Sequence, residues 1–207
     1  MSTANDKNFE AEASVAPKVD TLGLVRKAKA GDLDALQQLY VKYVNRVLSF
    51  VYRMVGSKSE AEDIVQDTFV SAYQKMSELK EDAKFQSWLF TIARNNVYQT
   101  YRTRGVAMVS LDHPAKADER PVAERVAAKS KTPEAAYLSD ELDHVIQSAL
   151  SLLNDKQREV FVLSALKKLS YEQVAEIVGR SVGAVKMDIH RARLVVRERI
   201  KNYLRRE

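Results

Sequence analysis

The sequence contains no cysteine, and it has few glycines and prolines for its length. The absence of cysteine excludes disulfides, a thiolate nucleophile and cysteine-ligated zinc, and it fits a reducing compartment. Six glycines and four prolines in 207 residues are few for a sheet with many tight turns, whereas the helix-favouring Ala, Leu, Glu, Lys and Arg abound. We therefore expect an all-α protein.

Long apolar runs and the common catalytic motifs are also missing. No apolar run approaches the roughly 20 residues of a membrane span, and the first 18 residues lack the features of a secretion signal. There is no GxxxxGK[ST] phosphate loop and no HExxH pair, and His113, His144 and His190 are not clustered. We expect a soluble, cytoplasmic protein without membrane insertion, with no catalytic residue, no metal site and no cofactor.

Charge is distributed unevenly along the chain, whose net charge is +5. Residues 21–104 carry 13 basic and 9 acidic side chains (+4), and residues 153–207 carry 13 and 7 (+6). Residues 105–152, with 5 basic and 8 acidic side chains, have a net charge of −3. Clustered Lys and Arg are typical of nucleic-acid binding, although a basic block alone is more often a solvated surface.

Composition and periodicity divide the chain into four segments. Residues 1–20 are polar and aperiodic, and we expect a disordered tail. Helical periodicity covers residues 21–104 and returns over 132–207, whereas residues 105–131 hold prolines and charges with little periodicity. The sequence therefore predicts two small helical domains joined by a flexible linker, the second ending in a helix-turn-helix.

Capping signals delimit the helices of the first domain. Asp32 is placed to cap a long amphipathic helix that ends at Gly56. Ser59, followed three residues later by Glu62, indicates a capping box for the next helix. A third helix is expected over 85–104, with an apolar side formed by Leu89, Ala93 and Val97.

The segment SYEQVAEIVGRSVGAVKMDIHRAR, residues 170–193, predicts two helices joined by a short turn. Ser170 and Gln173 indicate a capping box, Gly179 suits a left-handed helix end, and Ser181 begins the second helix. In a helix-turn-helix the second helix enters the major groove of DNA, although many helical hairpins bind nothing. The outward-facing candidates are Lys186, Met187, His190, Arg191 and Arg193.

Aromatic and basic residues alternate on one helix in FQSWLFTIARNNVYQTYRTR, residues 85–104. Aromatic rings stack on unpaired bases, amides bond base edges and Arg neutralises phosphate, a combination suited to single-stranded nucleic acid. The residues that share a face opposite the apolar side are Thr91, Arg94, Asn95, Tyr98 and Arg102. Phe85, Trp88 and Phe90 are alternatively core residues, and we expect this of at least two of them.

A third cluster is acidic and lies in EAEDIVQDTF, residues 60–69. Glu62, Asp63, Gln66 and Asp67 are expected on the solvent face of the predicted second helix. The two aspartates are like charges at i,i+4, an arrangement that costs roughly 0.2–0.5 kcal/mol. A basic partner would offset that cost, and the alternative is an ordinary acidic solvent face.

In this order around a linker, AEDIVQDTF, FQSWLFTIARN and LSYEQVAEIVGRSVGAVKMDIHRAR resemble the sigma-70 family of bacterial transcription initiation factors. The resemblance is to its small extracytoplasmic-function (ECF) group and covers about residues 21–104 and 134–200. It implies a factor that binds core RNA polymerase, directs it to specific promoters and promotes melting at the minus-ten element. Such a factor is not an enzyme.

The resemblance also assigns expected contacts. Asp63, Gln66 and Asp67 match positions that bind the clamp helices of the largest polymerase subunit, and the second domain would approach the flap region. The minus-ten candidates are Trp88, Arg94, Asn95, Tyr98, Arg102 and Arg104. The minus-thirty-five candidates are Ser181, Lys186, Met187, His190, Arg191 and Arg193.

Asp188 departs from the family pattern, because relatives often have a basic or neutral residue at that position of the reading helix. Its carboxylate would accept a bond from a cytosine amino group or orient Arg191 or Arg193. Near phosphates, the negative charge would weaken DNA binding.

The expected partners are core RNA polymerase, promoter DNA in double- and single-stranded form, and an anti-sigma factor, since such a protein commonly holds family members. One alternative is a stand-alone helix-turn-helix regulator, which predicts tight duplex binding by the isolated protein and leaves the acidic cluster unexplained. Another is a helical interaction module or anti-factor, which the basic segment 153–207 disfavours.

Overall fold

The computed structural model describes residues 20–107, 133–166 and 169–205. Every regular element in these ranges is helical, which confirms the predicted all-α class. The predicted tail, apart from Asp20, and most of the predicted linker lie outside these ranges. The α-helices are α1 (Thr21–Lys29), α2 (Leu33–Val55), α3 (Lys58–Gln74), α4 (Phe85–Ala107), α5 (Pro133–Ser151), α6 (Asp155–Phe161), α7 (Tyr171–Val178) and α8 (Val182–Leu204).

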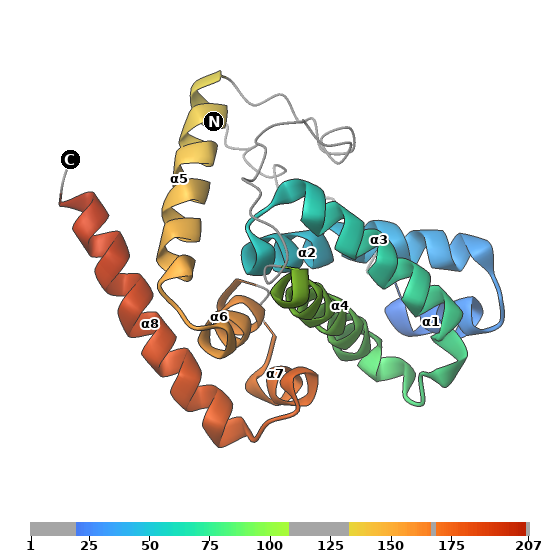
Figure 1. The fold of residues 1–207 in the computed structure, drawn as a ribbon. Coiled ribbons are helices and arrows are strands. Elements are labelled where there is room, and N and C mark those ends of the chain that lie inside the picture. Colours follow the sequence, from blue (N-terminus) through green and yellow to red (C-terminus); the bar gives the residue numbers. More distant parts are fainter. Residues whose placement is uncertain (1–19, 108–132, 167–168, 206–207) are drawn as a thin grey trace, which may run out of the picture.

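The helices form two bundles that touch each other (Figure 1). In the first bundle, α2 packs against α1, α3 and α4, and short 3-10 turns, η1 (Met76–Glu78) and η2 (Asp82–Lys84), lead into α4. In the second, α8 packs along α5, α6 and α7, and a π-helical segment, η4 (Val162–Leu166), follows α6. The bundles meet where α4 packs on α7 and α2 packs on α6, a contact that the sequence did not predict.

Aromatic and aliphatic side chains from the predicted apolar faces fill the core of the first bundle. Phe50 of α2 and Phe90 of α4 are both fully buried, and their ring centroids lie 5.6 Å apart in an edge-to-face arrangement. Leu89, Ala93 and Val97 are also fully buried, as their spacing predicted. Helix α4 therefore packs into the core of the first bundle through one side. Its other side is available for contacts outside that bundle.

Most predicted helix ends are found where the capping signals placed them. The Asp32 side chain accepts a hydrogen bond from the Ala35 amide at 3.0 Å, and α2 ends at Gly56 with a left-handed φ of 79°. Ser170 and Gln173 form the complete capping box of α7. In the described part of the chain, no helix is long and apolar enough to cross a membrane.

The predicted capping box at Ser59 is wrong. Helix α3 begins at Lys58, and its N-cap is Ser57, whose hydroxyl accepts a hydrogen bond from the Glu60 amide at 3.4 Å. Ser59 instead lies in the first turn with its side chain exposed. Both serines precede a glutamate by three residues, so the local pattern does not distinguish them.

We expect Ser57→Ala to lower the free energy of unfolding by about 0.5–1 kcal/mol, because the amide at the start of α3 loses its acceptor. Ser59→Ala is the matched control and should leave stability unchanged or slightly higher, since alanine favours a helix interior. Urea unfolding followed by far-UV circular dichroism measures both. Equal losses in the two variants would contradict the assigned cap.

Candidate functional site

The acidic cluster lies on α3 as an open surface. Asp63, Gln66 and Asp67 are all exposed, and in the described part of the chain none of the three makes a side-chain hydrogen bond or ion pair. Glu62 differs from the prediction, because it is half-buried. We call Asp63, Gln66 and Asp67 the acidic face; its two like charges form no ion pair with any residue that the structure describes.

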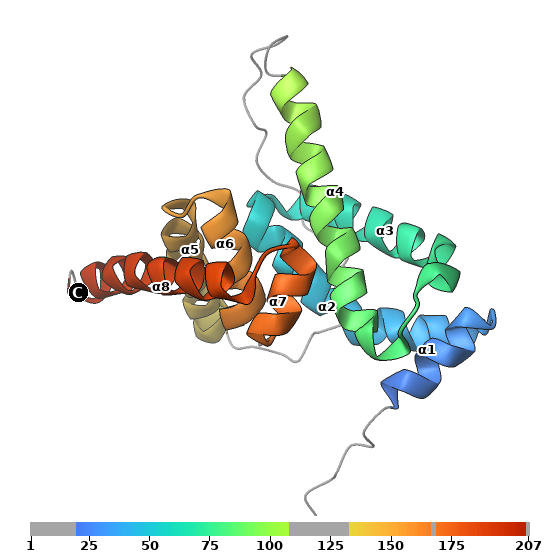
Figure 2. The same ribbon diagram turned by 90° about the horizontal axis from the view of Figure 1, so that it is seen from below.

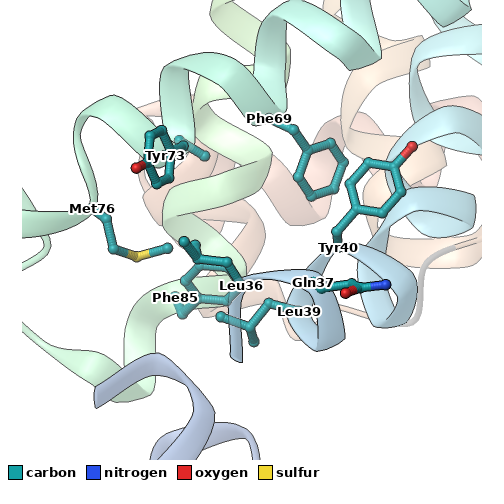
Figure 3. Close-up of a pocket in the computed structure, with 9 residues that line it drawn as sticks. Leu36, Gln37, Leu39, Tyr40, Phe69, Tyr73, Met76 and Phe85 are labelled. Carbon is teal, nitrogen blue, oxygen red and sulfur yellow. The ribbon is translucent and has the colours of Figure 1, made fainter. Parts of the chain in front are cut away.

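An apolar groove of about 220 Å³ lies beside this face, between α2, α3 and the start of α4 (Figure 3). The rings of Tyr40 and Phe69 meet edge to face at 4.8 Å, and Tyr73 is 58% exposed. Val70, 49% exposed, follows Asp63 by seven residues and so continues the acidic face along the helix. The groove is lined by Leu36, Gln37, Leu39, Tyr40, Phe69, Ala72, Tyr73, Met76 and Phe85.

The sequence analysis did not identify this groove. Val70 and Tyr73 extend the 63–66–67 face at helical spacing, and these two apolar residues on a solvent face were the available signal. Their partners on α2 come from more than 25 residues earlier in the chain, and sequence periodicity does not place them.

The aromatic residues at the start of α4 divide between core and surface. Phe85 is 3% exposed and Phe90 is fully buried, so the expectation that at least two of the three aromatics belong to the core is confirmed. Trp88 is half-buried, with its ring 6.0 Å from that of Phe85.

Further along α4 lies the single-strand face, the side predicted to bind single-stranded nucleic acid. Only part of it is free of contacts with the second bundle. Asn95 and Arg102 are exposed, whereas the side chain of Arg104 lies outside the described residues. Arg94 forms an ion pair with Glu159 of α6, and the Tyr98 hydroxyl donates to the same carboxylate at 3.3 Å. The Arg94 guanidinium also lies over the Tyr98 ring, 4.8 Å from its centroid.

Glu159 is the buried centre of this contact and was missed from the sequence. Its side chain is 3% exposed. Burial raises its pKa, although the neighbouring guanidinium of Arg94 and the hydrogen bond from Tyr98 act in the opposite direction. The pKa of Tyr98 is raised to about 12, first by burial and then by the Glu159 charge. Glu159 lies 65 residues from Arg94 in the chain, so no local pattern indicated the pairing.

The predicted helix-turn-helix is formed by α7 and α8. Gly179 has a left-handed φ of 65°, and the Ser181 side chain accepts a hydrogen bond from the Ala184 amide, capping α8. Val185 and Ile189 are buried on the side that faces α7 and α6. The remaining candidates on α8 are all exposed, as predicted: Lys186, Met187, His190, Arg191 and Arg193.

The Asp188 side chain does not make the contacts with Arg191 or Arg193 that were considered from the sequence. Its carboxylate pairs with the Arg180 guanidinium at 2.7 Å and is only 13% exposed, so it orients neither Arg191 nor Arg193. Arg180 lies in the turn before α8, and it balances the negative charge in the middle of that helix. The weakening of DNA binding anticipated for Asp188 is therefore offset within the domain.

The described residues contain no group of three or more His, Cys, Asp or Glu side chains that would hold a metal ion. His144 is exposed on α5 and His190 is exposed on α8, whereas His113 lies outside the described residues.

Family comparisons match both bundles. The family model described as sigma-70 region 2 matches residues 39–106, and the model described as sigma-70, region 4 matches residues 143–195. The first therefore contains α3, its acidic face and most of α4, and the second contains the helix-turn-helix.

Individual proteins are similar over most of the chain. The ECF RNA polymerase sigma factor SigW of Bacillus subtilis (strain 168) is 32% identical over 86% of this chain and 95% of its own. The ECF RNA polymerase sigma-E factor of Escherichia coli (strain K12) is 31% identical, covering 88% and 95% respectively.

Two solved complexes contain chains with a similar fold. CnrH in complex with the cytosolic domain of CnrY has a TM-score of 0.62 and 27% identity, covering 88% of this chain and 97% of that one. The sigma factor RpoE in complex with the anti-sigma factor NepR from Bartonella quintana has the same TM-score and identity, covering 80% and 96%.

Proposed function

Because this chain belongs to the ECF group of the sigma-70 family, we propose that it binds core RNA polymerase, directs it to specific promoters and promotes melting at the minus-ten element. Members of this family act as initiation factors and are not known as enzymes. Residues 21–104 would dock on polymerase and capture the minus-ten element, and residues 132–207 would read the minus-thirty-five element. Residues 1–20 and 105–131 would serve as tail and linker.

The single observation that carries the docking proposal is the acidic face, which lacks a counter-charge among the described residues. Asp63, Gln66 and Asp67 would bind the clamp helices of the largest subunit, whose basic side chains would relieve the i,i+4 repulsion. The apolar groove beside the face would accept a side chain of the same partner. A charged rim beside an apolar pocket is a common arrangement in protein interfaces.

For the minus-ten element, Asn95 and Arg102 are exposed on α4 and available to unpaired bases and phosphates. Arg94 and Tyr98 lie on the same side of the helix and would join them once released from Glu159. Trp88 is half-buried and would wedge or stack only with its outer edge. Arg104 would bind the backbone.

For the minus-thirty-five element, the first turns of α8 would enter the major groove. Lys186, His190 and Arg191 are exposed along one side of the helix and would contact base edges, while Met187 and Arg193 flank them. The amino end of α8, capped by Ser181, would lie at a phosphate.

Other partners follow from the same assignment. The second domain would approach the flap region of the polymerase, and the chain would work in the cytoplasm, where polymerase and promoters are. An anti-sigma factor is a further proposed partner, since one of the similar structures is a sigma factor bound to a protein of that class.

Gel filtration of the purified chain with its cognate core RNA polymerase tests the proposed function. We expect a one-to-one complex and, with promoter DNA, opening of the minus-ten region detected by permanganate reactivity of unpaired thymines. A folded chain that does not co-elute with the cognate core would instead support a stand-alone DNA-binding regulator.

A further inference from the structure

The contact between the two bundles occupies part of the proposed single-strand face. Arg94 and Tyr98 of α4 both bind the Glu159 carboxylate, and α7 packs against α4 beside them. A base or phosphate would have to displace Glu159 to pair with the Arg94 guanidinium, because the Glu159 carboxylate already holds it. The same arrangement leaves the acidic face and the reading side of α8 exposed.

We propose that this contact is an autoinhibitory latch: in the closed form Glu159 withholds Arg94 and Tyr98 from single-stranded DNA until the bundles separate. The inference rests on the proposed function, because it takes these two residues as part of the minus-ten face. It goes further in assigning a regulatory role to Glu159, which lies in the other bundle.

The geometry allows the polymerase to dock before the latch opens. In both views α3, which carries the acidic face, and α7, which covers α4, lie on opposite sides of α4 (Figures 1 and 2). A partner that binds α3 therefore approaches α4 from the side opposite to α7. In the closed form the acidic face and the candidate residues of α8 are exposed, whereas Arg94 and Tyr98 are bound to Glu159.

The contact between the bundles combines apolar packing with ion pairs, since the buried apolar residues of both bundles form one cluster. Arg53 of α2 pairs with Asp143 of α5, and the Tyr52 hydroxyl donates to the same carboxylate at 3.0 Å. Lys84 and Glu176 form a third pair at 3.3 Å with both side chains nearly half exposed, and such pairs contribute little. For a buried pair the desolvation penalty offsets much of the attraction, so these ion pairs need not add strongly to the stability of the closed form.

Opening can be measured directly because the chain has no cysteine. We would introduce Glu78→Cys on η1 and Arg197→Cys on α8, both at exposed positions, and attach a donor–acceptor dye pair. The free chain should give high energy transfer, and Glu159→Gln should lower it. Asp143→Asn, which leaves Arg94, Tyr98 and Glu159 intact, should lower it as well.

The functional readout is the affinity of the free chain for a fluorescein-labelled dT12 strand, measured by anisotropy. Glu159→Gln should bind dT12 about tenfold more tightly, since apparent affinity scales with the open fraction. Glu198→Gln, an identical charge change at an exposed position of α8, should not change it. Arg94→Ala should open the molecule without the gain, because it also removes a DNA-binding group.

Two results would overturn the latch. One is low energy transfer in the unaltered free chain, and the other is unchanged dT12 affinity in both Glu159→Gln and Asp143→Asn once opening has been seen. Neither affects co-elution with core polymerase, so a failure of the latch is distinguishable from a failure of the proposed function.

Discussion

Replacing both Asp63 and Asp67 with lysine should abolish binding to core RNA polymerase, weakening it by about 100-fold or more. The two carboxylates are exposed with no ion pair among the described residues, so their field is directed outward toward a basic partner. The two lysines would place positive charge against the basic side chains of the partner, and such like-charge contacts cost several kcal/mol. Each 1.4 kcal/mol corresponds to a tenfold change in affinity. Gel filtration or labelled-core titration measures the effect.

This variant should keep its fold, because the substituted side chains touch no core residue and lysine favours a helix more than aspartate does. Far-UV circular dichroism checks that point. Lys186→Ala with Arg191→Ala is the complementary variant, which should bind polymerase normally and lose promoter selection. Undiminished polymerase binding by Asp63→Lys/Asp67→Lys would show that the acidic face has been assigned wrongly.

Phe50→Ala should lower the free energy of unfolding of the first bundle by about 3–5 kcal/mol. Phe50 is fully buried and meets Phe90 edge to face, so truncation removes the packing that joins α2 to α4 and leaves a cavity. Domains have total stabilities of about 5–15 kcal/mol, so the loss would take a large share. Trp88, the single tryptophan, reports on this bundle by fluorescence during urea unfolding.

Leu33→Ala is the matched control for that measurement. Leu33 begins the same helix and is 68% exposed, so its truncation should change stability by less than about 0.5 kcal/mol. A loss below about 1 kcal/mol for Phe50→Ala would contradict its place at the centre of the core.

The sequence was sufficient where a structural feature depends on neighbours in the chain. Asp32, Gly56 and Gly179 act within one helical turn, and all three were assigned correctly. The apolar side of α4 followed from periodicity alone. The N-cap of α3 was assigned to Ser59 instead of Ser57, because Ser59 and Glu62 fit the same local rule as Ser57 and Glu60.

Prediction was weaker where partners are distant in the chain. One expectation from the sequence was that Asp188 would orient Arg191 or Arg193 on its own helix. It pairs instead with Arg180 in the turn before α8, a contact that depends on how α7 and α8 cross. Glu159 was missed because its partners lie in the other bundle. The exposed residues of the acidic face and of α8 were identified from sequence, but which parts of α4 are accessible depends on how the bundles meet.

Arg158 shows how the two bundles can separate without leaving a buried backbone carbonyl unpaired. Its guanidinium donates to Met54 O in the first bundle and to Leu150 O and Leu153 O in the second. Met54 O also accepts a bond from the Tyr101 hydroxyl at 2.7 Å. After separation the Met54 carbonyl keeps the Tyr101 hydroxyl, and the Arg158 guanidinium keeps the carbonyls of Leu150 and Leu153. Parting the bundles therefore leaves none of these three carbonyls without a hydrogen bond.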